Sequence, residues 1–122
     1  MKDKFPIFWV SPKMVRVLSI FSVISFEAIT LGPVVISKSP LSVEIKRHER
    51  IHYLQYKELF FIGFLILYLF DLLCGYWKFR DWQKAYFHIR FEQEAYTYMW
   101  EVNYCKNRKA FAWKNFRVET KD

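Results

Sequence analysis

The 122-residue sequence contains few of the residues that cross-link or interrupt a fold, with two cysteines, three glycines and four prolines. Cys74 and Cys105 belong to no CxxC pair and lack the spacing of a cysteine-ligated metal site, so we expect two free thiols. No internal repeat or low-complexity segment occurs. A chain of this length can bury a core without cross-links, so residues 1–122 are expected to form one domain.

The N-terminal segment lacks the features of a cleaved signal peptide. Pro6, Pro12, Lys13 and Arg16 interrupt its apolar run, and no small-x-small cleavage site follows. If the protein reaches a membrane, we expect its later segments to take it there.

Acidic residues are also scarce, with 12 Asp and Glu against 19 Lys and Arg, a net charge of +7. The composition is 53% hydrophobic and 21% aromatic, which argues against disorder and suits a protein lying against a membrane. A basic chain can also bind nucleic acid. Here the positive charges are dispersed among apolar segments, and only residues 105–117 resemble a patch, which argues against a nucleic-acid partner.

The first half of the chain carries clear start and turn signals. Ser11 followed by Pro12 predicts the N-terminus of a helix. Residues 25–40 are rich in β-branched side chains and are broken by Gly32 and Pro33, which predicts two short strands about a turn.

A helix is expected to follow this hairpin. Ser39 or Ser42 could cap it, and no Gly or Pro occurs from Leu41 through Ile62. This helix would run into residues 59–77, where Asp71 is the only formal charge.

The apolar segment has the composition of a membrane segment but is short. Residues 59–70 are uncharged, whereas a spanning helix needs about 20 apolar residues. Tyr, Trp and Lys residues flank the segment, as is typical of an interfacial element. We therefore expect a hydrophobic hairpin at about residues 59–80 to insert fully or partly into a membrane. A core or partner-binding helix in a soluble protein is the alternative.

Further along, Asp81 is expected to cap a short helical turn and residues 85–91 to be extended. Residues 91–111 then predict a second helix, with Glu92 and Glu94 in its first turn, where carboxylates interact favourably with the helix dipole.

The motif with the most specific chemistry is HExxH, formed by His48, Glu49 and His52 with two residues between. On a helix the two imidazoles project from one face and can bind a single Zn²⁺. The glutamate beside them is placed to take a proton from an attacking water molecule and pass it to a leaving amine. A catalytic zinc needs a third protein ligand, and the segment RFEQEAY supplies Glu92 or Glu94.

These segments together resemble the gluzincin metallopeptidases, and in particular small bacterial zincin-like proteins with an HExxHxxQ helix. The resemblance covers roughly residues 27–100, through AITLGPVVIS, HERIHYLQ, a long apolar helix and RFEQEAY. It implies that Glu92 is the third ligand, with Glu94 as the alternative, and that Gln55 supports a ligand. An edge strand within residues 28–37 would hold an extended substrate.

The resemblance also implies a His or Tyr that stabilises the oxyanion. His88 is the first candidate, although a lone histidine among aromatic residues is more often structural, and Tyr53 and Tyr96 are weaker candidates. The chain departs from larger gluzincins in having no obvious second lobe to build substrate pockets.

A shared zinc requires the chain to return after the apolar segment. Residues 52–77 would extend about 38 Å as a helix, whereas residues 77–92 return only about 22 Å if helical. An extended segment between residues 78 and 91, with the apex of the hairpin near residues 74–80, would close the gap. A kink at Gly63 is the other solution.

We therefore expect a mainly helical α+β, zincin-like fold with an N-terminal helix, a short β-hairpin, a long HExxH helix and an antiparallel C-terminal helix. The expected function is a membrane-associated zinc metallopeptidase of the bacterial cell envelope, with a peptide or protein substrate and lipid contacts. The alternative is a non-catalytic zincin-like subunit of a membrane or envelope complex.

Overall fold

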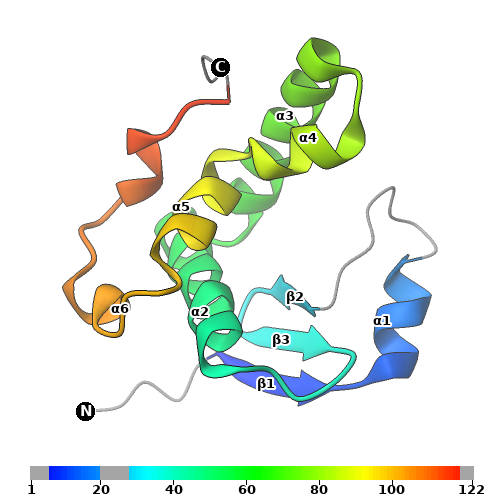
Figure 1. Cartoon of the computed structure of the whole chain (residues 1–122), viewed down its shortest axis with the longest axis vertical. Coiled ribbons are helices and arrows are strands. Elements are labelled where there is room, and N and C mark those ends of the chain that lie inside the picture. The colour runs from blue at the N-terminus through cyan, green and yellow to red at the C-terminus, as the bar shows by residue number, and fades with distance from the viewer. Residues whose placement is uncertain (1–5, 20–27, 119–122) are drawn as a thin grey trace.

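The computed structural model describes residues 6–19 and 28–118, which are mainly helical with one three-stranded sheet (Figure 1). In chain order the elements are β1 (Ile7–Val10), α1 (Pro12–Ser19), β2 (Ala28–Leu31), β3 (Val34–Ser37), α2 (Val43–Glu58), α3 (Ile62–Phe79), α4 (Trp82–Phe87), α5 (Arg90–Tyr98), α6 (Tyr104–Asn107) and the 3₁₀ helix η1 (Ala112–Asn115). The sheet and α1 lie at one end, the α3–α4 pair at the other, and α2 and α5 between them. The mainly helical class with a small sheet is confirmed, while the zincin-like arrangement stays a prediction.

The predicted hairpin is present. β2 and β3 pair antiparallel around Gly32, whose φ of 60° is the left-handed conformation that glycine adopts without strain. β1, which the sequence patterns did not indicate, pairs parallel with β3 and completes the order β1-β3-β2. β2 is thus an edge strand of the described sheet, on the side next to α2.

The expected caps of α1 and α2 are confirmed. The Ser11 hydroxyl accepts from the Met14 backbone N–H at 3.2 Å at the start of α1. Ser42, and not Ser39, caps α2 by accepting from the Ile45 backbone N–H at 3.2 Å.

The helix that carries the histidines ends sooner than expected. α2 stops at Glu58, and Phe60 and Phe61 adopt left-handed φ angles of 54° and 63° before α3 begins. The prediction of one helix running into the apolar segment is therefore wrong, because lacking Gly and Pro does not by itself keep a helix continuous. Packing explains the break, since it lets Phe64 fold back and stack on Tyr56 with ring centroids 3.9 Å apart.

α3 and α4 form an antiparallel pair whose turn lies at Arg80 and Asp81, at the end of the predicted apex. Asp81 caps α4 as expected, since its Oδ1 accepts from the backbone N–H groups of Gln83 and Lys84 at 2.9 and 3.2 Å.

The return of the chain is helical, so the prediction of an extended segment at residues 85–91 is wrong. α4 covers Trp82–Phe87, and α5 starts at Arg90. Gly75 permits this close return, because a Cβ there would lie 3.0 Å from the Cα of Ala85. The break between α2 and α3 brings Glu92 back to the histidines without an extended segment. α3 leaves α2 in a new direction, so the two helices do not add up to one straight path (Figure 1).

The last predicted helix is too long. α5 ends at Tyr98 instead of continuing to residue 111, and only the short α6 and η1 follow. Arg47 Nη1 donates to the backbone oxygen of Met99 at 2.6 Å, which fixes the end of α5 on α2. The chain beyond it is held by Arg108, which lies between Glu58 and Glu94.

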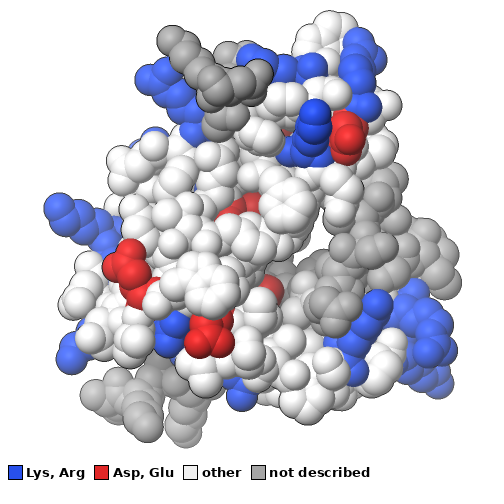
Figure 2. All heavy atoms as spheres, viewed as in Figure 1, with Lys and Arg blue, Asp and Glu red and all other residues white. Residues whose placement is uncertain are grey.

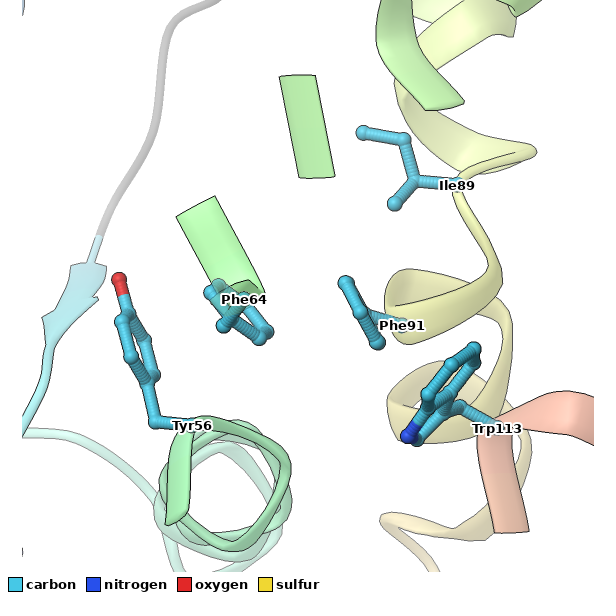
Figure 3. Packing of buried hydrophobic residues seen from close by; sticks show 5 residues of the cluster. All are labelled: Tyr56, Phe64, Ile89, Phe91 and Trp113. Carbon is cyan, nitrogen blue, oxygen red and sulfur yellow. The ribbon is translucent and has the colours of Figure 1, made fainter. Parts of the chain in front are cut away.

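The hydrophobic core is an aromatic cluster that joins α2, α3, α5 and η1. Phe64 stacks on Tyr56 and also on Phe91, with centroids 4.5 Å apart in the second pair. Ile89 and Trp113 complete the cluster (Figure 3). This cluster fixes the separation of α2 and α5, from which the candidate site residues project.

Candidate metal centre

The side chains of His48, His52 and Glu92 meet between α2 and α5, and each residue is only 4% exposed. The two Nε2 atoms lie 3.2 Å apart, and Glu92 Oε1 lies 3.2 Å from the Nε2 of His48 and 3.0 Å from that of His52. The histidines project from successive turns of α2, as their spacing predicted, and Glu92 comes from the first turn of α5.

The spacing of these three atoms fits a zinc ion. Tetrahedral ligands at about 2.0–2.1 Å from zinc lie about 3.3–3.4 Å from one another. The observed separations of 3.0–3.2 Å are close to that value. Two imidazole nitrogens and one carboxylate oxygen are also donor types that zinc prefers. The support of His48 is less complete than a zinc ligand usually has, because its Nδ1 is buried without a hydrogen-bond partner among the described residues.

Gln55 fixes the tautomer of His52. Its Nε2 donates to the backbone oxygen of Phe91 at 3.1 Å and to Oε1 of Glu94 at 2.9 Å. Its Oε1 can only accept, so it accepts from the Nδ1–H of His52 at 2.8 Å. A neutral His52 then directs the lone pair of Nε2 toward Glu92, which is the tautomer that a metal ligand needs.

Glu94, the alternative third ligand, lies outside the histidine cluster. Its Oε2 accepts from the Tyr104 hydroxyl at 2.7 Å and from Arg108 Nε, and its Oε1 accepts from Gln55. Arg108 also makes a bidentate pair with Glu58 at 2.7 and 3.0 Å. Glu94 therefore anchors Gln55, and Glu92 is the glutamate beside the histidines.

Glu49 lies next to the cluster and is held from the sheet. Thr30 of β2 donates from its hydroxyl to Glu49 Oε1 at 2.6 Å, whereas Glu49 Oε2 lies 4.0 Å from the Nε2 of His48. The backbone oxygen of Thr30 accepts from the Tyr56 hydroxyl at 2.8 Å, which joins β2 to α2. One carboxylate oxygen is thus fixed, and the other remains near the histidines.

Two polar residues of α3 also support the site, although no motif identified them. The Tyr68 hydroxyl donates to Glu92 Oε2 at 2.7 Å. Asp71 is fully buried and accepts from Nε, Nη2 and the backbone N–H of Arg90 at 2.9, 2.8 and 3.1 Å. It thereby fixes the start of α5 just before Glu92. A lone carboxylate in an apolar segment could have indicated Asp71, whereas Tyr68 carried no comparable signal.

Two of the oxyanion candidates, Tyr96 and His88, lie in different places. Tyr96 packs edge-on against His48 with ring centroids 4.4 Å apart, and its hydroxyl lies 3.0 Å from that of Tyr86. His88 is the C-cap of α4, where its Nδ1 donates to the backbone oxygen of Lys84 at 2.7 Å. Tyr96 therefore borders the histidine cluster, whereas His88 caps the C-terminal end of α4.

The electrostatics of the cluster favour a cation. Burial lowers the pKa of His52, but the Glu92 carboxylate outweighs burial and raises it to about 9. Burial raises the pKa of Glu92, yet His52 and His48 together hold it well below its usual range. Burial and the charge of Glu92 raise the pKa of Tyr68, so its hydroxyl stays a donor. Without a metal the cluster is an ion pair, and a metal cation can replace the proton of His52.

Comparisons with protein-family models, curated proteins and solved structures each found no match to the chain. The resemblance to gluzincins therefore rests on the sequence motifs alone.

Proposed function

We propose that the protein is a membrane-associated zinc metallopeptidase, in which His48, His52 and Glu92 hold Zn²⁺. The observation that carries this proposal is the meeting of three buried ligand atoms within 4.8 Å of one another. The orientation of His52 by Gln55 supports it further, because a hydrogen-bonded imidazole is the usual state of a zinc ligand. When bound, Zn²⁺ lowers the pKa of a water molecule and polarises a carbonyl group.

Glu49 acts as the general base and then as the general acid. Thr30 holds its Oε1, so its Oε2 takes the proton from the attacking water and delivers it to the leaving amine. The Tyr96 hydroxyl, bonded to that of Tyr86, is a nearer oxyanion candidate than His88. A peptide substrate could pair with β2, whose only partner in the described sheet is β3.

Metal analysis and one substitution test this proposal. We expect stoichiometric tightly bound zinc in the parent protein under metal-replete conditions and its loss in His48→Ala and Glu92→Ala. Glu49→Gln should keep zinc and abolish hydrolysis of a peptide library, because an amide cannot accept the proton. Glu101→Gln, a change at an exposed position that follows α5, is the matched control. Less than stoichiometric zinc in the parent would refute the metal site, and turnover by Glu49→Gln would refute the role of Glu49.

A non-catalytic zincin-like subunit of a membrane or envelope complex is the second candidate. The observation that favours it is burial, because Glu49 is only 6% exposed and the histidines 4%, which leaves little room for a substrate. This candidate predicts stoichiometric zinc and co-purification with a partner at fixed stoichiometry. It also predicts that Glu49→Gln has no effect on the cell, whereas a peptidase would lose its cellular function.

A further inference from the structure

α3 presents apolar side chains to solvent along one face. Seven of them recur at helical spacing, are each between 51% and 75% exposed, and are here named the α3 stripe: Ile62, Leu65, Ile66, Leu69, Phe70, Leu73 and Trp77. Among the described residues, α3 is the helix long and apolar enough to span a membrane, yet only 17% of it is buried. A continuous apolar face of this kind indicates a binding surface.

Positive charge lies along one flank of the stripe. An open groove there is lined by apolar side chains of α3 and by three basic residues, Lys78, Arg90 and Arg117. The groove also contains the Asp71 carboxylate, which pairs with Arg90, so its lining holds three basic residues against one acidic residue. Lys and Arg side chains also gather at the end of the molecule where α3 meets α4 (Figure 2). An apolar face with a cationic rim complements a lipid surface with anionic headgroups.

The polar contacts of α3 show which orientation such a surface requires. α3 is about 27 Å long, close to the hydrocarbon thickness of about 30 Å, so in an upright helix Asp71 would lie near the bilayer centre. Arg90 and Glu92, bound to Asp71 and Tyr68, would lie at the same depth, and burying such charges in a bilayer is costly. With α3 lying flat, the stripe faces the lipid and all these groups stay on the opposite side.

We propose that the α3 stripe is an in-plane membrane-binding face selective for anionic phospholipids, with Lys78 and Arg117 contacting the headgroups. The proposal deepens the membrane-associated part of the proposed function, and it is independent of zinc and catalysis. It places the histidine cluster on the water side of the interface, with α3 between that cluster and the lipid.

Vesicle co-sedimentation of the full chain tests the lipid selectivity. We expect stronger binding to vesicles in which phosphatidylglycerol replaces about a third of the phosphatidylcholine than to phosphatidylcholine alone. Lys78→Gln with Arg117→Gln should weaken binding to the anionic vesicles about thirtyfold and change binding to the neutral vesicles little. Leu69→Ser with Leu73→Ser should weaken binding to both.

The matched controls are Lys13→Gln in α1 and Val43→Ser at the start of α2, which are exposed but lie away from α3. Both should bind like the parent. Equal binding of the parent to the two kinds of vesicle, or equal losses in the control variants, would overturn the proposal. The parent could instead form a stable dimer that dissociates in Leu69→Ser and shows no vesicle binding. That result would overturn the proposal and assign the α3 stripe to contact with a second copy of the chain.

Nitroxide depth measurement tests the orientation. Single labels at Ile62, Leu69 and Trp77, with Cys74 and Cys105 replaced by Ser, should lie at similar depth if α3 is flat. A Leu69 label much deeper than the two end labels would overturn the in-plane orientation. Glu49→Gln and zinc-depleted protein should bind vesicles like the parent, so a failure of this proposal and a failure of the zinc site are distinguishable.

Discussion

α2 and α3 invert the usual distribution of polarity in opposite ways. α2 buries His48, Glu49 and His52, whereas α3 exposes a stripe of large apolar side chains. Each arrangement costs free energy unless something compensates it. The buried polar groups of α2 are compensated within the chain by hydrogen bonds and ion pairs. The α3 stripe has no such compensation among the described residues, and for this reason we propose a lipid surface as its partner.

The largest loss of stability is expected when the ion pairs that compensate buried charges are broken. Arg108 has a side chain only 4% exposed and pairs with both Glu58 and Glu94. Arg108→Met leaves two carboxylates without their partner, and the free energy of unfolding should fall by about 3–5 kcal/mol. Denaturant unfolding measures this effect. Arg50→Met, at an exposed position of α2, should change stability by less than about 0.5 kcal/mol. An equally small loss in Arg108→Met would show that the buried network contributes little.

The next effect is the pH dependence of the metal-free protein. The folded pKa of His52, about 9, lies above its ordinary value of 6.5, so its stabilising contribution is complete below about pH 6.5 and is lost as the pH rises through 9. The loss should reach about 3 kcal/mol in denaturant unfolding of chelator-treated protein.

Zinc-loaded protein provides the control for this pH dependence. Its His52 has no proton to lose, so this component of the pH dependence should be absent. The same alkaline loss with and without zinc would exclude His52 as its source.

A smaller effect, on zinc affinity, is expected when the hydrogen bond that orients His52 is removed. Gln55→Leu keeps a side chain of similar size but removes the acceptor for the Nδ1–H, so zinc affinity should fall about 10–100-fold. In metal-free protein above about pH 10, where His52 is neutral, ¹⁵N NMR should show a larger share of the Nε2–H tautomer of His52. Gln83→Leu in α4 is the matched control. Unchanged affinity and an unchanged tautomer in Gln55→Leu would contradict the orienting role.

The sequence could predict the elements whose signals are local. Ser11, Ser42 and Asp81 cap helices as their residue types indicate, and Gly32 marks the turn of the hairpin. The i,i+4 spacing also predicted that His48 and His52 project together. Each of these conclusions depends on residues within one or two turns of each other.

Several failures of prediction depend on packing between different secondary-structure elements, which no local signal indicates. α2 breaks because Phe64 stacks on Tyr56, and α4 is helical because Gly75 admits Ala85. β1 forms because β3 is available as a partner. Helix and strand propensities differ by only a few tenths of a kcal/mol per residue, and such packing readily outweighs them. A single sequence does not reveal this packing.

The smallest expected change in stability follows from a substitution in the α3 stripe, and it allows the exposed and buried faces of one helix to be compared. Leu69 is 54% exposed, so Leu69→Ser should change the free energy of unfolding in solution by less than about 0.5 kcal/mol. Phe64, on the opposite face, is 3% exposed and stacks on two rings, so Phe64→Ala should cost about 3–5 kcal/mol. Denaturant unfolding of the two variants compares the faces directly. A cost for Leu69→Ser approaching that of Phe64→Ala would mean that the stripe is covered within the chain, and the membrane-facing role of α3 would then have to be abandoned.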